Sequence, residues 1–487
     1  MRALVKNIIR TGLLFGALSL SAVAQDISYK NKNALPEIGV VASNALSLDK
    51  EEILGDVMMR QIRGQAPLVM DPVLDEYLQD LGNRLVIHAD SAKFPFRFFW
   101  VNNSAINAFA FFGGHIGVHT GLIHNAKSES ELASVLAHEV AHVTQRHLAR
   151  KMQAQQRSAP LALASMVGGL LLALASPEAG MAALASSQAA SAQMQIDYTR
   201  SNEEEADRIG ITMLARAGFD PNGAAGFFST LNEQYRLVSM PPARLLSHPL
   251  TESRIADARA RAANYEQVRI PKRLAFHLAR ARVMARYTLD EKFSLEYFEA
   301  AVEKNDYPMA EAGRYGLALA YLRNNKPQKA RPIIESLLAE HGENLFYLDA
   351  ATDISLAEEK FDEAIERLQP HLERTPRNQV LALNQANALI EAGQYKRAIL
   401  ILKDFILVNE DYEVAYQLLT EAYKRAQDRK DMHQSKAEVF ALNGAYQRAI
   451  DELQFAYNYT GESHLEKQKI RARIRQLRED EERIKRL

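Results

Sequence analysis

The chain contains no cysteine, and this absence restricts its chemistry most. Without thiols it can form no disulfide and carry no cysteine-linked lipid, and any metal site has to rest on histidine and carboxylate ligands. Charge of one sign is also missing: 59 basic residues stand against 60 acidic ones, so nothing indicates a nucleic-acid-binding surface. Long apolar runs are missing too, since Leu13–Val23 and Leu161–Ala175 are shorter than the roughly 20 residues that cross a bilayer.

The first 24 residues have the outline of a secretory signal peptide. Three basic residues precede the apolar stretch, and Ala22-Val23-Ala24 follows as a small-residue cleavage site. Cleavage would remove three basic and no acidic residues, leaving 56 against 60 and a formal charge of −4. The alternative is an uncleaved membrane anchor, for which the apolar core is short. At 487 residues the whole chain is expected to contain two or three domains.

Residues 138 to 142 read His-Glu-Val-Ala-His, inside a stretch, Leu132 to Met152, that has the composition and period of a helix. Ser128 and Glu131 form a capping-box pattern just ahead of it, which supports a helix start there. Two histidines four residues apart project from the same face, so both imidazoles can reach one metal ion. The motif therefore predicts a Zn²⁺ site with two histidine ligands and Glu139 as general base.

A catalytic zinc needs a third protein ligand and an open fourth position. The next dense group of candidates is Glu203-Glu204-Glu205-Ala206-Asp207, again in a helical context that continues to Leu214. Glu203 and Asp207 share a face of that helix, which suits one carboxylate on the metal and one behind it. A solvated acidic face is the alternative, and the upstream motif favours the metal site.

These motifs together resemble the zinc metallopeptidases related to the CAAX prenyl proteases. The metal-helix motif and the Glu203-x-x-Ala206-Asp207 motif match that family. So do Asn107-Ala-Phe-Ala with Gly113 to Leu122 before them, and Ser247 to Ile255 after them. The combination spans about residues 100 to 255 and is highly specific. The prenyl proteases themselves span membranes several times, whereas this chain does not.

The resemblance implies a role for each site residue. One Zn²⁺ per chain is expected on His138, His142 and Glu203, with Glu139 as base and proton donor to the leaving amine. Asp207 looks like the hydrogen-bond partner of a ligating histidine. A positive group is still needed to stabilise the oxyanion, and Arg254 is nominated, with a structural salt bridge as the alternative.

His248 lies in a turn-like context, Leu246-Ser-His-Pro-Leu250, that could direct its imidazole at the cleft. As a fourth protein ligand it would convert an open catalytic site into a closed one. The alternatives are a contact behind the ligands or a place in the cleft lining. The remaining nearby histidines have no partners at ligand spacing and are interpreted as structural or surface residues: His115, His119, His124 and His147.

Two segments around the motifs have distinctive patterns. Phe94 to Val101 is expected to be a strand, and Phe109 to Val118 a second strand or hairpin edge broken at Gly113-Gly114. An exposed edge beside the metal could hold an extended peptide. Between the metal segments lies an apolar insertion, about residues 159–195. A buried helical hairpin, a flap over the cleft and a peripheral membrane contact all remain open for it.

After about Tyr265 the chain becomes unbroken amphipathic helix with a repeat. Matching segments ending in Ala330, Ala364 and Ala398 are spaced by 34 residues, which is the tetratricopeptide period. A related segment ends in Ala449, 51 residues after the third, so the last repeats are irregular. Such repeats stack into a superhelix with a concave binding face.

The sequence thus predicts an α+β, mostly helical protein. We expect a signal peptide (1–24), a zincin-like zinc metalloprotease domain with a small sheet (25–268), and an α-solenoid of tetratricopeptide repeats (269–487). The resemblance, with the export signal and repeats, implies a periplasmic endopeptidase of Gram-negative bacteria. Its implied clients are unfolded or stalled outer-membrane β-barrel proteins, including the lipopolysaccharide transporter, on the β-barrel assembly machinery. The alternative is a chaperone or scaffold for that assembly with a largely latent protease site.

Overall fold

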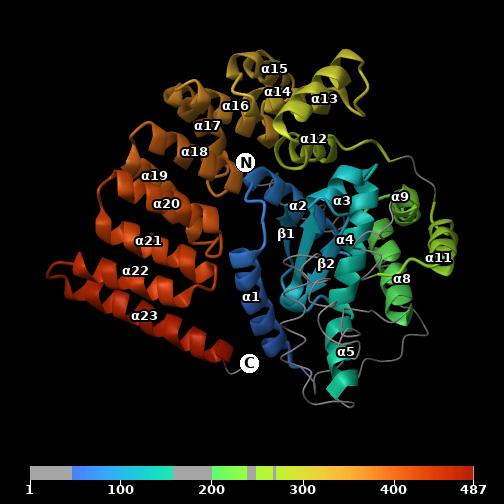
Figure 1. Cartoon of the computed structure of the whole chain (residues 1–487), viewed down its shortest axis with the longest axis horizontal. Coiled ribbons are helices and arrows are strands. Elements are labelled where there is room, and N and C mark those ends of the chain that lie inside the picture. Colours follow the sequence, from blue (N-terminus) through green and yellow to red (C-terminus); the bar gives the residue numbers. More distant parts are fainter. Residues whose placement is uncertain (1–45, 157–199, 238–247, 267–269, 486–487) are drawn as a thin grey trace, which may run out of the picture. The chain divides into compact units, whose positions relative to one another are not determined.

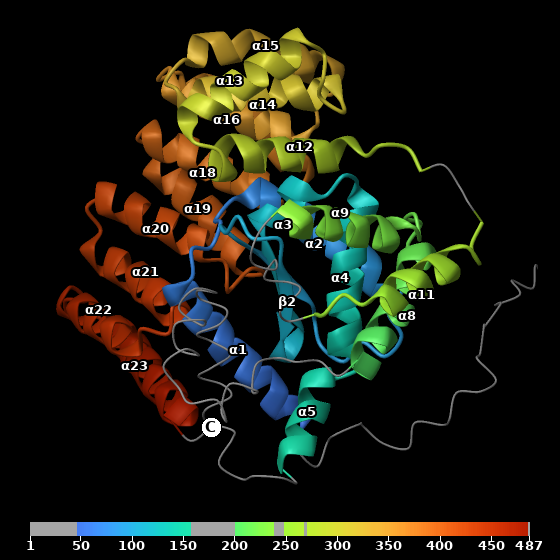
Figure 2. The same cartoon turned by 45° about the vertical axis from the view of Figure 1, so that its right-hand side comes forward.

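The computed structural model describes residues 46–156, 200–237, 248–266 and 270–485, which all belong to one compact unit, Ala42–Leu487. The expected signal peptide and apolar insertion lie outside the described residues. Most of the described chain is helical, with one small sheet, which confirms the predicted fold class (Figures 1 and 2). Among the described helices, none is long and apolar enough to span a membrane.

The sheet has three strands in the order β1-β3-β2. β1 (Arg97–Val101) runs parallel to β3 (His115–His119), and β2 (Ala108–Phe111) pairs antiparallel with β3. The predicted first strand is therefore shorter than expected. The predicted break at Gly113-Gly114 is confirmed: both glycines have positive φ in the short helix η1 (Phe112–Gly114) that joins β2 to β3.

Two helices precede the sheet. α1 (Leu48–Gln65) starts at Ser47 and α2 (Pro72–Val86) at Asp71, and each cap side chain accepts a hydrogen bond from a backbone N–H of the first turn. α1 packs closely on η1, because a Cβ added at Gly55 would lie 2.2 Å from the carbonyl oxygen of Phe112. This contact fastens α1 to the edge of the sheet.

The predicted helix Leu132 to Met152 is two helices, α4 (Glu129–Thr144) and α5 (His147–Gln156). The break falls at Arg146, a non-glycine residue with φ of 52°. At the start, the Ser128 hydroxyl accepts from the Glu131 N–H as predicted, whereas the Glu131 carboxylate accepts from Lys127 N–H. The described residues of this part also form α3 (Thr120–Asn125), α8 (Arg200–Arg216), α9 (Gly223–Leu237) and α11 (Glu252–Ala262).

The rest of the described chain is an array of paired helices that follow one another beside α2 and α1 (Figure 1). The small residues predicted at the repeat contacts, Ala330, Ala364 and Ala398, are fully buried. The array consists of α12 (Leu274–Val283), η3 (Met284–Thr288), α13 (Glu291–Glu303), α14 (Ala310–Arg323), α15 (Pro327–Glu340), α16 (Leu345–Ala357), α17 (Phe361–Arg374), α18 (Gln379–Glu391), α19 (Tyr395–Ile406), α20 (Glu413–Arg425), α21 (Arg429–Leu442), α22 (Tyr446–Asn458) and α23 (His464–Lys485).

The repeat helices pack directly against the part of the chain that precedes them. A single hydrophobic cluster contains buried residues from both sides of the expected domain boundary near residue 268, the first being Val69 and the last Val380. Polar contacts add to it: Asn378 donates to Glu76, and Tyr412 donates to Asp75. Part of the repeat array therefore packs on α2 of the same chain.

Candidate metal centre

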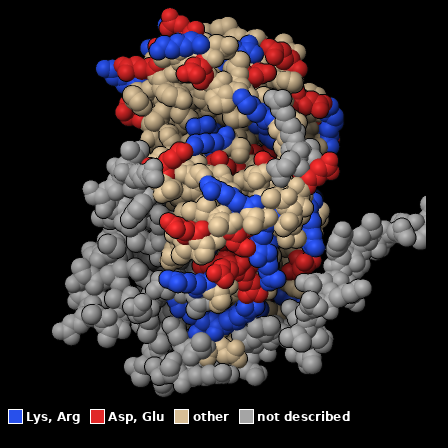
Figure 3. All heavy atoms as spheres, turned by 90° about the vertical axis from the view of Figure 1, so that its right-hand side faces the viewer, with Lys and Arg blue, Asp and Glu red and all other residues tan. Residues whose placement is uncertain are grey.

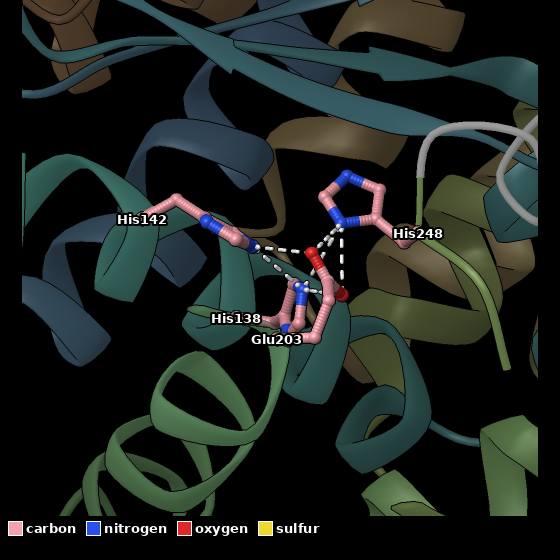
Figure 4. Close-up of side chains that lie close together, drawn as sticks. All are labelled: His138, His142, Glu203 and His248. Carbon is pink, nitrogen blue, oxygen red and sulfur yellow. Dashed lines mark hydrogen bonds and ion pairs between the residues drawn. The ribbon is translucent and has the colours of Figure 1, made fainter. Parts of the chain in front are cut away.

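Four side chains from three segments converge on one point (Figure 4). α4 supplies His138 and His142, α8 supplies Glu203, and His248 comes from the segment just before α11. All four are at least 96% buried, and among the described residues they form the single group with metal-ligand geometry. The structure thus brings together the three predicted ligands and the predicted optional fourth.

Gly210 on α8 makes this convergence possible. A Cβ there would lie 3.2 Å from the backbone nitrogen of His138, so α8 and α4 cross with their backbones almost in contact. The crossing lies seven residues beyond Glu203, about two helical turns along α8. Close helix packing therefore carries the Glu203 carboxylate to the two histidines.

The spacing of the ligand atoms fits a tetrahedral zinc site. Four atoms 2.0–2.1 Å from zinc at tetrahedral angles are about 3.3 Å apart. His138 Nε2 lies 2.9 Å from His142 Nε2, 3.3 Å from His248 Nδ1 and 3.4 Å from a Glu203 oxygen. Glu203 also lies 3.0 Å from His248 Nδ1 and 3.5 Å from His142 Nε2. Histidine nitrogens and a carboxylate oxygen are ligands that zinc accepts in proteins.

The protonation of the cluster without a metal follows from burial and charge. Burial alone would raise the pKa of Glu203, but His248 and His138 hold it well below its ordinary value. Burial alone would lower the pKa of His138, but Asp207 and Glu203 raise it. The pKa of His142 is well below normal because it is buried beside other histidines. Glu203 is thus ionised and His142 neutral, the forms in which both bind metals.

Asp207 lies behind His138 as expected. Its Oδ1 is 2.9 Å from His138 Nδ1, so the other ring nitrogen faces the cluster. Arg254 donates two hydrogen bonds to the same carboxylate, at 2.7 and 2.9 Å. Burial would raise the pKa of Asp207, but the bonds from His138 and Arg254 lower it to about 2. Asp207 is therefore an anion that fixes the orientation of His138.

The contacts of Arg254 suit a structural ion pair better than the binding of an oxyanion. Besides Asp207, its Nη1 contacts a Glu203 oxygen at 2.9 Å and donates to the Pro249 carbonyl at 2.7 Å. The side chain is only 4% exposed. Its N–H groups are committed to these acceptors, which supports the structural salt bridge that the sequence left as the alternative.

Glu139 and His248 are neighbours at the site. Glu139 is completely buried, and its Oε1 lies 3.7 Å from His248 Nε2. The His248 ring therefore stands between the predicted base and the ligand cluster, with its Nδ1 toward Glu203.

His147 is a functional candidate that the sequence reasoning missed. Its Nδ1 lies 2.7 Å from His142 Nδ1, and its Nε2 lies 3.1 Å from a Glu205 oxygen. A spacing of five residues does not share a face in a continuous helix, so no periodic signal identified it. The other three histidines that the sequence set aside do not join the cluster: buried His115 and His119, and half-buried His124.

The face that carries α8, α9 and α11 shows basic and acidic side chains interspersed among uncharged ones (Figure 3). On that face the described residues form no broad area of one sign. The balanced composition is thus reflected in a mixed surface beside the metal centre.

Comparisons with known proteins agree with this geometry. Residues 72–262 match peptidase family M48, and residues 355–406 match a tetratricopeptide repeat. The chain is 43% identical over 485 residues to the beta-barrel assembly-enhancing protease of Escherichia coli K12, covering 99% of each chain. The chain belongs to peptidase family M48. It is a metalloprotease that carries tetratricopeptide repeats.

Two further relatives show how far the likeness extends. A Vibrio cholerae protein that provisionally bears the same name is 44% identical over 473 residues, 97% of each chain. The mitochondrial metalloendopeptidase OMA1 of Arabidopsis thaliana is 34% identical over 135 residues, 27% of this chain and 25% of that protein. The first likeness includes the repeats, whereas the second is confined to a shorter segment.

Proposed function

We propose that the chain is an exported zinc endopeptidase that acts in the assembly and quality control of outer-membrane β-barrel proteins. The observation that carries the catalytic part is the convergence of His138, His142 and Glu203 beside buried Glu139. The family and the nitrogen–oxygen donor set support a metal of the zinc type.

Each residue has a role in peptide hydrolysis. Zinc held by His138, His142 and Glu203 would supply Lewis-acid chemistry to water and to the scissile carbonyl. Glu139 takes a proton from the attacking water and delivers it to the leaving amine. Asp207 holds the ring of His138 in its ligating tautomer, and Arg254 holds Asp207 in place.

His248 acts as a fourth ligand that keeps the enzyme latent. Its Nδ1 lies within 3.3 Å of both Glu203 and His138, which suits ligation better than a place in the cleft wall. A fourth imidazole leaves no position for water, so the site is closed until His248 moves. A client or partner can open it only by binding the open form more tightly than the closed one.

The repeats and the relatives support the biological part of the proposal. The Escherichia coli relative is named for β-barrel assembly, and its likeness spans almost the whole chain. We therefore assign as clients unfolded or stalled outer-membrane β-barrel proteins, including the lipopolysaccharide transporter, and as partner the β-barrel assembly machinery. The location is the periplasm, reached by cleavage of the signal peptide at about residue 24.

Metal content and cleavage together test the catalytic proposal. The purified protein is expected to hold one Zn²⁺ per chain and to cleave an unfolded protein. Glu139→Gln should keep the metal and lose cleavage by about 10²-fold or more, because it removes the base and no ligand. A His138→Ala, His142→Ala double variant with full zinc occupancy would refute the site.

The competing function is a chaperone or scaffold in which binding dominates. It is supported by the extensive repeat array and by the closed arrangement around His248. Glu139→Gln separates the two in cells that lack the native protein. Complete loss of the β-barrel assembly phenotype indicates a protease, and partial rescue indicates a separate chaperone role.

The sign of one substitution tests the latch. His248→Ala should increase cleavage of an unfolded protein, because it frees the fourth position while His138, His142 and Glu203 remain. Decreased or unchanged cleavage with zinc still bound would rule out the latch and favour a role of His248 in the cleft or in the transition state.

A further inference from the structure

The two predicted histidine ligands are oriented by different hydrogen-bond partners. His138 meets a carboxylate directly, since its Nδ1 lies 2.9 Å from Asp207. The Nδ1 of His142 lies 2.7 Å from the Nδ1 of a third histidine, His147. We propose that His147 and Glu205 are positioning residues that hold His142 as a metal ligand through a histidine–histidine–carboxylate relay. The inference rests on the proposed metal site.

The hydrogen bonds of the relay can run in only one direction if His142 binds the metal through Nε2. A His142 ring that presents the lone pair of Nε2 to the cluster carries its hydrogen on Nδ1. That hydrogen is donated to the lone pair of His147 Nδ1, so His147 carries its own hydrogen on Nε2. There it is donated to Glu205, whose oxygen is 3.1 Å away. Every ring nitrogen in the relay then has a partner.

The far end of the relay is anchored by a cation. Arg150 donates to the same Glu205 oxygen at 2.9 Å, from a position one turn beyond His147 on α5. His147 itself is fully buried, whereas Glu205 is about one quarter exposed. The carboxylate therefore stays ionised at the protein surface, while the ring that it orients is sealed beside His142.

The break between α4 and α5 lies between His142 and His147 and allows their rings to meet. In a continuous helix, residue 147 would lie about 140° around the axis from residue 142, and the two rings would diverge. The left-handed conformation of Arg146, φ 52°, interrupts the helix there, and the ring centroids of His142 and His147 lie 4.8 Å apart. Such a conformation costs a residue with a side chain free energy and persists where the surroundings enforce it.

Arg146 is held in that conformation from outside the helix. Its guanidinium donates to Glu51 at 2.7 and 3.0 Å and to the Leu46 carbonyl at 2.7 Å. All of these contacts are buried, and they join the turn between α4 and α5 to α1 and to Leu46 just before it. A strained turn fastened by a buried ion pair, directly between a metal ligand and its ring partner, indicates a functional constraint rather than a random helix end.

Two substitutions at His147 separate orientation from packing. Asn places an oxygen where the Nδ1 of His147 lies and can still accept from His142, but it leaves a cavity. Phe fills the volume of the ring and offers no acceptor. If His147 acts by accepting a hydrogen bond from His142, His147→Phe should weaken Zn²⁺ binding and His147→Asn should retain most of it. If His147 acts only by filling space, His147→Asn should weaken Zn²⁺ binding more than His147→Phe.

The measurement is the Zn²⁺ dissociation constant of the full chain, by competition with a chelator of known affinity. Loss of an outer partner typically weakens metal binding about 10–100-fold, and we expect this for His147→Phe. Unfolding of the metal-free proteins provides the second readout, in which His147→Asn should be the less stable variant. Wild-type affinity in His147→Phe, or equal loss in both variants, would overturn the proposal.

A second pair covers the case in which the His147 variants do not fold. Glu205→Met removes the terminal acceptor from a partly exposed position, and Glu204→Met changes its exposed neighbour as a matched control. Zn²⁺ should bind more weakly to Glu205→Met than to Glu204→Met, and equal affinities contradict the relay. All four variants keep His138, His142 and Glu203. Failure of the wild-type chain to bind Zn²⁺ would instead refute the metal site itself.

Discussion

Replacing Arg282 should detach the repeats from the catalytic half more effectively than any surface change. Arg282 is 2% exposed and lies on α12 between the two parts. It forms ion pairs of 2.6 Å with Asp71, the N-cap of α2, and with Asp349 on α16. It also donates to the Tyr315 hydroxyl at 2.9 Å. One guanidinium thus joins three elements that are far apart in the sequence.

The cost of removing this charge can be worked out from the contacts. Two unit charges about 4 Å apart interact by about 4 kcal/mol at an effective dielectric constant of about 20. Removing one member of a buried ion pair typically costs about 3–5 kcal/mol, since the other charge remains buried without a partner. Arg282→Met would take the shared partner from two buried carboxylates and leave Arg286 as the remaining cation near them, so we expect a loss of about 3–5 kcal/mol of unfolding free energy.

The assay is urea unfolding followed by circular dichroism at neutral pH. The matched control is the triple variant Asp71→Asn, Arg282→Met, Asp349→Asn, which removes all three charges and keeps the start of α2, because asparagine is as good an N-cap as aspartate. It should recover much of the loss, because an uncharged buried cluster carries no unpaired ion. A loss below about 1 kcal/mol for Arg282→Met, or a triple variant no more stable than the single one, would show that the Arg282 ion pairs do not stabilise the fold as proposed.

The same network determines how truncations should be interpreted. Removal of residues from about 310 onward would take away Asp349 and Tyr315 and leave Arg282 exposed at a new surface. It would also cut through the hydrophobic cluster that includes Val380. Loss of client cleavage in such a truncation therefore reports destabilisation as well as lost recruitment, and single substitutions are the sharper probe of the repeats.

Three further outcomes are expected. Burial raises the pKa of Asp75 to about 8, so the protonated side chain stabilises the folded chain at acidic pH. This stabilisation is lost as the pH rises from about 4 to about 8. Asp75→Asn should therefore make the free energy of unfolding less dependent on pH in that range. Gly55→Ala should lower the unfolding free energy by about 1–3 kcal/mol, since its Cβ would meet the Phe112 carbonyl. Chelation should lower the melting temperature, and Zn²⁺ should restore it in proportion to the logarithm of its concentration.

The parts of the site that could be predicted from the sequence lie within single helices. His138 and His142 are four residues apart on α4, and Glu203 and Asp207 four apart on α8, so helical geometry alone directs each pair. In the structure Glu203 indeed faces the cluster and Asp207 faces the back of His138. The repeat period was equally local, because it depends on small residues at fixed spacing.

The parts that could not be predicted depend on contacts between distant segments. The orientation of His147 requires a break at Arg146, and that break is enforced by Glu51, 95 residues earlier in the chain. No propensity at Gln145 or Arg146 marks a helix end. Arg254 was nominated for the oxyanion because of its charge, but its hydrogen bonds to Asp207 and Pro249 become visible only once α11 is placed against α8.

Asp71 shows why sequence patterns predict single helices but not how the repeats pack on the rest of the chain. Its position before Pro72 identifies a helix cap, and its side chain does accept from the Leu74 N–H. The same carboxylate also binds Arg282, 211 residues away, and accepts from Tyr287. Arg282 and its neighbour Arg286 hold the pKa of Asp71 below its ordinary value although burial alone would raise it. A residue that satisfies a local rule thus also carries the charge that joins the repeats to the catalytic half, and only the packing of α2 against α12 reveals the second role.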